Sequence, residues 1–250
     1  IIGSDGLWRS QLRVAGGNGE HRVAVNLRRL QLDGFRHHSE SRVYGASIIG
    51  QHRLSPTWQL VSVLNIYDAP YLLNPSSMAR NDADTRPRYA RGFVVAQGAS
   101  KTARQVQGGV TLRHESNATR TELTLFGVDR SLYSPIPGAV IDLDRVSGGL
   151  RATHSRDRSL GSTPVRWQVG LDVETQTDDR AEYDNEGLTD QDIAAEDVPD
   201  AVVRGALVLD QQERVRSVAP FAAVDIRPFT ELLVTLGGRL DRYRMEATDA

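Results

Sequence analysis

Apolar and polar residues alternate along much of this chain, and the alternation is clearest between residues 165 and 174. The apolar positions there are Val165, Trp167, Val169, Leu171 and Val173. The polar positions between them are Arg166, Gln168, Asp172 and Glu174. Because successive side chains of a β-strand point to opposite faces, this pattern predicts a strand with one apolar and one polar face.

The same alternation predicts ten strands, whereas helical periodicity is nearly absent. The expected strands are 5–14, 20–32, 41–54, 57–68, 102–115, 119–131, 142–156, 164–177, 213–226 and 229–244. Many exceed the roughly 5 to 6 residues typical of globular strands and suit the roughly 9 to 11 residues with which a tilted strand spans a membrane. The pattern therefore favours an all-β, antiparallel fold with membrane-spanning strands.

The connections between these strands alternate between tight and long. Turn residues form the tight connections at 16–19, 55–56, 116–118, 158–162 and 227–228. Longer connections lie between them at 33–40, 69–101, 134–139 and 177–211. Short periplasmic turns that alternate with long extracellular loops are typical of an up-and-down outer-membrane β-barrel. A soluble β-sandwich or propeller module that binds carbohydrate or protein remains the alternative.

Composition narrows the function classes further. The chain has 250 residues, of which 39% are hydrophobic, and its mean hydropathy is -0.39. No run approaches the roughly 18 apolar residues of a spanning helix, but strands need only alternate apolar positions. The net charge of -2 gives no indication of nucleic-acid binding, and the lack of cysteine excludes disulfides and thiolate metal sites. Metalloprotease, nucleophile-elbow, Walker and dinucleotide motifs are also absent, so we expect no enzyme and no cofactor.

Several segments, in this order along the chain, resemble siderophore-type TonB-dependent outer-membrane receptors. They include GSDGLWRSQLRVAGG near the start, LNIYDAPYLLNPSSM at 64–78, TRTELTLFGVDRSLYSPIP at 119–137, and WQVGLDVETQTDDRAEYDNEG at 167–187. The resemblance implies a 22-stranded transmembrane barrel, filled by an N-terminal plug, that imports ferric siderophores with energy relayed through TonB. Residues 1–250 would then be about ten strands of that barrel, as a partial barrel domain without the plug and the C-terminal strands.

The resemblance also implies partners and a location. The chain would lie in the outer membrane of a Gram-negative bacterium, against lipid and lipopolysaccharide. It would contact TonB only through the plug. Its cargo would be a ferric siderophore or a similar anionic chelate.

The connection 69–101 supplies the candidate ligand-binding residues, because guanidinium groups pair with anionic oxygens and aromatic rings cover apolar ligand surfaces. The candidates are Arg80, Arg86, Arg88, Tyr89, Arg91, Tyr71 and, from the preceding connection, His37. A solvated loop that touches lipopolysaccharide phosphates is the other interpretation. Adjacent His37 and His38 point to opposite faces of a strand, so we expect surface roles for them and no metal chelation.

The acidic connection 177–211 is expected to be an extended, charged extracellular loop. Within it, Glu182, Asp184, Glu186, Gly187 and Asp190 mimic part of a calcium-binding loop, but Ile193 stands where a bidentate glutamate is needed. Aromatic residues are expected to form interfacial belts near strand ends. These residues are Trp8, Trp58, Tyr67, Tyr133, Trp167 and Phe229.

Overall fold

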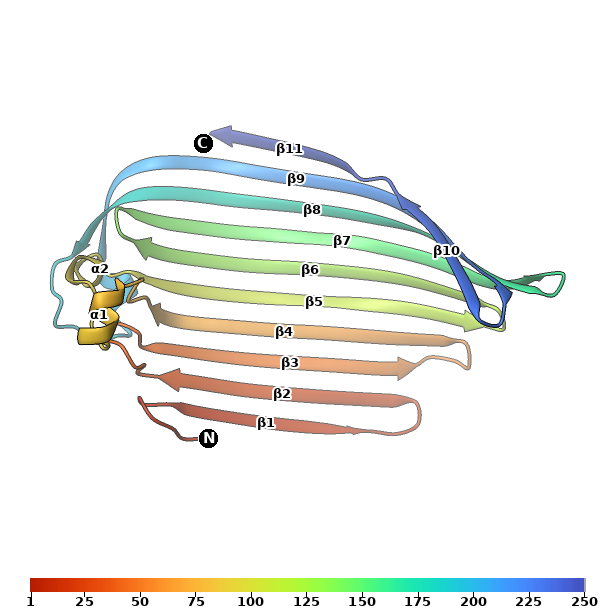
Figure 1. Cartoon of the computed structure of the whole chain (residues 1–250), viewed down its shortest axis with the longest axis horizontal. Helices are drawn as coiled ribbons and strands as arrows, with labels where there is room; N and C mark the ends of the chain where they lie inside the picture. The colour runs from red at the N-terminus through yellow and green to blue at the C-terminus, as the bar shows by residue number, and fades with distance from the viewer. Residues whose placement is uncertain (250) are drawn as a thin grey trace.

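The computed structural model describes residues 1–249, which form one antiparallel sheet (Figure 1). Its strands are β1 (Trp8–Gly17), β2 (His21–Leu32), β3 (Ser41–Arg53), β4 (Trp58–Leu73), β5 (Ser100–Ser116), β6 (Thr119–Ile136), β7 (Ala139–Leu160), β8 (Thr163–Leu188), β9 (Val202–Phe229), β10 (Leu232–Arg239) and β11 (Arg242–Asp249). Each strand from β1 to β10 pairs with the next in sequence, which is the up-and-down order that the alternation predicts.

The sheet is open, with β1 at one edge and β10 and β11 at the other. The expected strand 229–244 is divided at Leu240 and Asp241, and both of its parts pair with β9. The all-β, antiparallel prediction is confirmed. The alternative of a sandwich or propeller is wrong for residues 1–249, since they form a single sheet without a second layer.

The two ends of the sheet differ, as the connection lengths predict. At one end, here called the turn end, short turns join β1 to β2, β3 to β4, β5 to β6, β7 to β8 and β9 to β10. The opposite end, here called the loop end, carries segments 33–40, 74–99 and 189–201. These segments contain the short helices α1 (Arg80–Thr85), α2 (Gly92–Ala96) and α3 (Val198–Ala201). None of the described helices has the length and apolar character needed to cross a membrane.

Two of the expected loops are largely strand. β8 continues to Leu188 and β9 begins at Val202, so most of 177–211 is paired backbone and only 189–201 connects the strands. Likewise β6 reaches Ile136 and β7 starts at Ala139, which leaves a tight turn in place of the loop 134–139. Charged side chains do not prevent strand formation where they face water, because the ladder needs only the backbone groups.

The two faces of the sheet carry different side chains. On the apolar face, Leu125, Val169 and Val218 are 48%, 44% and 44% exposed. Register places Leu150 and Val173 in the same row as Leu125 and Val218. The residue pairs on either side of this row point to the opposite face. This polar face carries the charged and amide side chains. The chain therefore builds one broad, exposed aliphatic surface and one polar surface.

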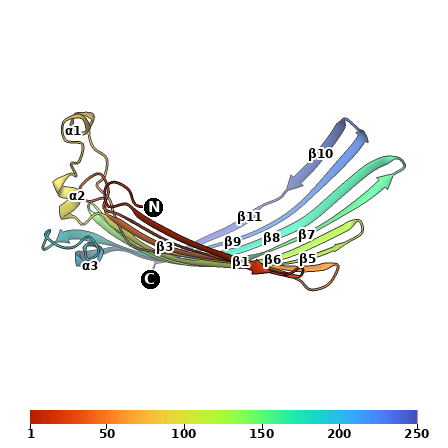
Figure 2. The same ribbon diagram turned by 90° about the horizontal axis from the view of Figure 1, so that it is seen from below.

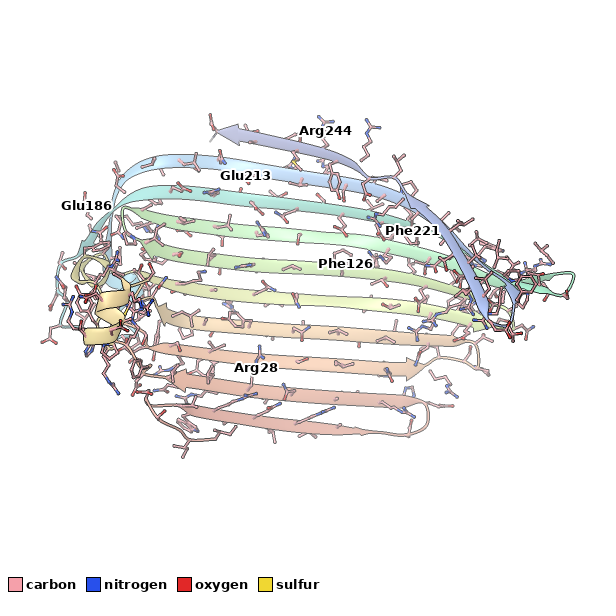
Figure 3. The ribbon with its side chains drawn as sticks, in the orientation of Figure 1. Arg28, Phe126, Glu186, Glu213, Phe221 and Arg244 are labelled. Carbon is pink, nitrogen blue, oxygen red and sulfur yellow. The ribbon has the colours of Figure 1, made fainter. Side chains whose placement is uncertain are left out.

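The polar face is crowded although it lies on an open sheet. Asp172 and Asp178 are 2% and 3% exposed, because arginines on neighbouring strands cover them. The Phe126 ring lies over Gly149 on β7, where a Cβ would come within 2.7 Å of the Phe126 Cζ atom. Figure 3 labels Phe126 together with Phe221, whose ring lies over Gly170 in the same way.

The sheet is curved along its strands. Figure 2 shows α1 and α2 rising at the loop end toward the same side to which β10 bends at the turn end. Crowding of the polar face agrees with this face being the inner, concave one, because curvature brings side chains on the inside of a sheet together.

Candidate ligand-binding site

Segments 33–40 and 74–99 meet at the loop end around Arg36. Its guanidinium donates from Nε and Nη2 to the Tyr89 carbonyl oxygen at 3.1 and 2.9 Å. It also donates to the carbonyl oxygens of Ser76 at 2.5 Å and Pro75 at 3.1 Å. Five donors in a fixed planar fork make arginine suited to hold several carbonyl groups at once. Arg36 thus orders the segment that carries most of the predicted ligand-binding residues.

His38 is buried, so the expected surface role is wrong for this residue. Its Nε2 donates to the Ala99 carbonyl oxygen at 2.9 Å, which joins segment 33–40 to the start of β5. Burial lowers the pKa of His38, and this effect outweighs the opposing contributions of the Ala99 carbonyl and Glu40. The neutral imidazole is therefore part of the packing between these segments. His37 beside it is exposed, and its backbone N–H donates to the Arg88 carbonyl at 2.9 Å.

Three of the predicted arginines form ion pairs in the structure. Arg80 lies 3.9 Å from Asp84 and its side chain is 96% exposed. Arg86 contacts Asp82 at 2.5 Å and lies over the Tyr89 ring, 4.1 Å from the centroid.

Arg88 lies 3.4 Å from Asp5 and 4.9 Å from the centre of the Phe35 ring. These contacts tie the 74–99 segment to the residues before β1 and to segment 33–40. An anionic ligand would have to compete with the aspartates for these arginines.

Arg91 and Tyr71 occupy different positions. Arg91 precedes α2 as its N-cap residue and forms no ion pair among residues 1–249. Tyr71 lies on β4, 5% exposed, under the guanidinium of Arg42 at 5.1 Å. Arg42 in turn binds Glu196 at 2.9 Å, which links β3 to segment 189–201. The arginine that covers Tyr71 thus belongs to β3 and not to the 74–99 segment.

The loop-end segments are also joined to the tops of the longer strands. The side-chain amide of Asn185 on β8 donates to the carbonyl oxygens of Gln97 and Ile136, both at 2.9 Å. The Gln97 side chain accepts from the Gly138 N–H at 3.1 Å. The predicted ligand-binding segment is thus held from both sides by residues that the strand pattern alone does not single out.

The calcium-loop resemblance does not correspond to a cation site. Glu182, Asp184 and Glu186 lie on β8 at alternate positions of an extended strand, which cannot wrap around an ion. Arg180 pairs with Glu182. No group of three or more potential metal-ligating side chains occurs in the part of the chain that the structure describes.

Aromatic residues occur at both margins of the apolar face. At the loop end, Arg29 lies over the rings of Trp8 and Tyr44, 4.7 and 5.6 Å from their centroids. At the turn end, Trp58 stacks on His114 at 4.5 Å, and Trp167 lies 5.3 Å from His154.

Tyr67 departs from the expected belt. It is paired with Gln105 and Gly45 in the row of the polar face, next to Arg28 and Gln107.

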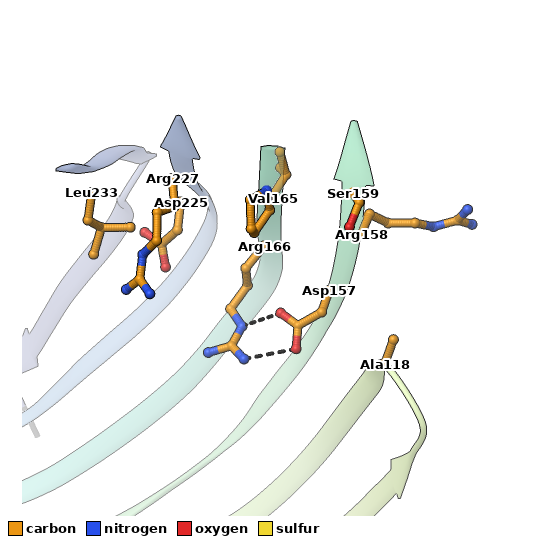
Figure 4. Close-up of a pocket in the computed structure, with 10 residues that line it drawn as sticks. Ala118, Asp157, Arg158, Ser159, Val165, Arg166, Asp225, Arg227 and Leu233 are labelled. Carbon is orange, nitrogen blue, oxygen red and sulfur yellow. Dashed lines mark hydrogen bonds and ion pairs between the residues drawn. The ribbon is translucent and has the colours of Figure 1, made fainter. Parts of the chain in front are cut away.

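A hollow of about 670 Å³ opens at the turn end between β7, β8 and β9 (Figure 4). Its main polar feature is the bidentate pair of Arg166 with Asp157, at 2.6 and 2.9 Å. Asp225 accepts a hydrogen bond from Thr235 at 2.7 Å. Since Arg166 is already paired with Asp157, and the hollow lies at the end opposite to the arginine-rich segment, it is a weaker candidate for an anion site.

Comparison with solved structures identifies the fold. The chain is similar to the ferric citrate transporter FecA in its unliganded form, with a TM-score of 0.79, 14% identity, and coverage of 99% of this chain and 36% of that chain. It is similar to the ferripyoverdine receptor of the outer membrane of Pseudomonas aeruginosa, with a TM-score of 0.75, 15% identity, and coverage of 100% and 37%. It is also similar to the ferric-catecholate import receptor Fiu from E. coli K12, with a TM-score of 0.76, 14% identity, and coverage of 98% and 44%.

The chain has the fold of part of a siderophore-receptor barrel. It spans less than half the length of the solved chains that it matches. No protein-family model and no curated protein sequence matches it. At 10 to 16% identity the likeness concerns the fold alone.

Proposed function

We propose that the chain is part of the barrel of a TonB-dependent receptor in the outer membrane of a Gram-negative bacterium. In this proposal the receptor imports a ferric siderophore or a similar anionic chelate and catalyses no reaction. The observation that carries the proposal is the match of essentially the whole chain to proteins whose names state iron-chelate transport or an outer-membrane receptor for an iron chelate. The exposed aliphatic face of the sheet supports it, because such a surface suits lipid better than water.

The proposed mechanism assigns the loop end to ligand capture. The arginines of segment 74–99 would pair with the anionic oxygens of the chelate, and Tyr89 would cover its apolar parts. Arg91 is the leading candidate because none of the described carboxylates pairs with it. Ion-paired residues of the polar face would line the lumen around a plug, which in turn would contact TonB.

Uptake of radiolabelled iron tests this function. The intact protein would be produced in the outer membrane of an iron-starved Gram-negative strain without its own chelate receptors. Ferric citrate, a ferric hydroxamate and a ferric catecholate would be offered in turn, with and without TonB. We expect uptake of one of the three that depends on TonB. Absence of the protein from the outer membrane, or uptake unchanged by loss of TonB, would contradict the proposal.

A matched pair of variants tests the ligand site. Arg91→Gln removes a cation at the loop end and should weaken binding of the accepted chelate by about tenfold, which corresponds to one charge-assisted hydrogen bond. Arg158→Gln removes an exposed cation at the turn end and should leave the dissociation constant unchanged. Equal effects of the two substitutions on the dissociation constant would show that segment 74–99 is not part of the ligand-binding site.

A further inference from the structure

Two histidines face each other at the turn end of the apolar face. His21 on β2 lies directly opposite His52 on β3. Their Nδ1 atoms are 3.2 Å apart, and the ring centroids are separated by 5.4 Å with an angle of 47° between the ring planes. Without a bound ion, one neutral imidazole can donate its Nδ1–H to the other. The same two nitrogens are also suitable ligands for a metal ion.

The separation of the two nitrogens fits a shared metal ion. Zinc binds imidazole nitrogen at about 2.0 to 2.1 Å, so two nitrogens 3.2 Å apart subtend an angle of about 100° at the metal. This angle lies between the values for octahedral and tetrahedral coordination. We propose that His21 and His52 form a surface site for a divalent transition-metal ion, such as Zn²⁺ or Cu²⁺, with water as the remaining ligands.

The surroundings leave room for one ring and fix the backbone next to the other. A Cβ at Gly50 would lie 3.1 Å from the His52 Nε2 atom and 2.6 Å from the Ser62 Oγ atom, so the glycine leaves the space in which the His52 ring lies. On the other strand, the Asn18 Oδ1 atom accepts hydrogen bonds from the N–H groups of Glu20 and His21, at 2.8 and 2.7 Å. These bonds fix the turn immediately before His21.

The ligand set indicates which ions would bind. Neutral imidazole suits Zn²⁺, Ni²⁺ and Cu²⁺, and divalent ions follow an affinity order that places Cu²⁺ above Zn²⁺. Two protein ligands leave the site open to solvent, so binding is expected to be reversible. Acid should release the ion because a protonated imidazole cannot coordinate. The site rests on the β2–β3 pairing and its immediate neighbours, and it is independent of the proposed function, whose ligand segment lies at the opposite end of the sheet.

Titration of the untagged intact protein in detergent with Cu²⁺ and Zn²⁺ tests the site. We expect one Cu²⁺ per chain with two nitrogen ligands in its electron paramagnetic resonance spectrum, and competition by Zn²⁺. His21→Asn and His52→Asn should each weaken binding at least about tenfold. His114→Asn, which alters a histidine stacked on Trp58 at the same end, should bind as the parent does.

Circular dichroism of each variant would establish that the sheet is intact. Zn²⁺ should raise the melting temperature of the parent and of His114→Asn, but not that of His21→Asn or His52→Asn. Gly50→Ala keeps both imidazoles but crowds the His52 ring, so it should also weaken binding. Parent-like affinity in either His21→Asn or His52→Asn, or the absence of stoichiometric binding by the folded parent, would overturn the proposal.

Discussion

On the apolar face Val169 is 44% exposed, whereas three residues further along the same strand, on the polar face, Asp172 is 2% exposed. A water-soluble sheet with one buried face shows the opposite arrangement, with its aliphatic side chains covered and its carboxylates in solvent. The difference supports the proposal that lipid, in place of water, surrounds the aliphatic face. Lipid suits the aliphatic face, and an enclosed polar interior suits the ion-paired face.

The largest expected effect comes from placing a charge on the apolar face. Val169→Arg should cost about 2 to 4 kcal/mol if the residue lies near the bilayer midplane, and should block assembly in the membrane. Gln168→Arg, one residue earlier and on the polar face, should assemble normally. The fraction of protein that shows heat-modifiable migration in the outer membrane measures both. Equal assembly of the two variants would contradict the assignment of the faces.

Crowding of the polar face gives the next effect. Gly149→Ala places a methyl group 2.7 Å from the Phe126 ring and 2.6 Å from the Val173 carbonyl oxygen, so it should destabilise the sheet by about 1 to 3 kcal/mol. Gly238→Ala places the same group on the apolar face, where nothing lies within 4 Å. It should be close to neutral. Urea unfolding in detergent measures both changes, and a neutral Gly149→Ala would show that Phe126 moves aside easily.

The strands themselves could be predicted from the sequence, but their full lengths could not. Alternation identifies 119–131 because one face of this strand is aliphatic, with residues such as Leu123 and Leu125. Beyond the apolar band this pattern ends, and the acidic residues of 177–188 belong to a strand whose sequence looks like a loop. Pro70 makes the end of β4 hard to predict, because proline has no N–H to donate to the ladder. The register of β4 with β5 shifts at this point, between Ala69 and Leu72.

The loop end could be predicted in composition but not in its contacts. Arginine density marks segment 74–99, yet the residue that organises it, Arg36, lies in another connection and binds backbone carbonyls. Such contacts have no sequence signature, because any residue supplies a carbonyl. The same holds for His38, whose left-handed backbone (φ 57°) and burial reverse the expectation of a surface residue.

A smaller effect is expected from the carboxylate of Asp172. Arg151 binds it at 2.6 and 3.0 Å and Arg239 at 2.5 Å, so Asp172→Asn leaves two guanidinium groups without their counter-ion. Because both arginines are about half exposed, the cost should be about 1 kcal/mol. Asp157→Asn, which breaks the exposed pair with Arg166, should cost no more than about a few tenths of a kcal/mol. Urea unfolding measures the loss of stability in both variants, and equal losses would mean that burial of Asp172 adds nothing to the strength of its ion pairs.

The smallest effect concerns pH at the loop end, outside both faces. The pKa of His38 is lowered by burial, so the unfolded segment binds a proton more readily than the folded one. The contact with Ala99 is therefore fully stable above the ordinary histidine range and weakens as the pH falls below about 6.5 toward the lowered pKa. The protection factors of residues 36–40 against hydrogen exchange, which correct for the intrinsic slowing of exchange in acid, should fall in this window, but not in His38→Asn. Identical pH profiles for the two proteins would contradict this role.

The most direct test of the central claim is an accessibility scan along β8. The chain contains no cysteine, so single cysteines at 165–174 can each carry a spin label in the intact protein reconstituted into bilayers. Collision with oxygen reports lipid, and collision with a water-soluble nickel chelate reports solvent. We predict a period of two, with oxygen favoured at Val165, Trp167, Val169, Leu171 and Val173, and with low oxygen exposure at the positions between them. Uniform exposure to the nickel chelate at all ten positions would contradict a lipid-facing sheet.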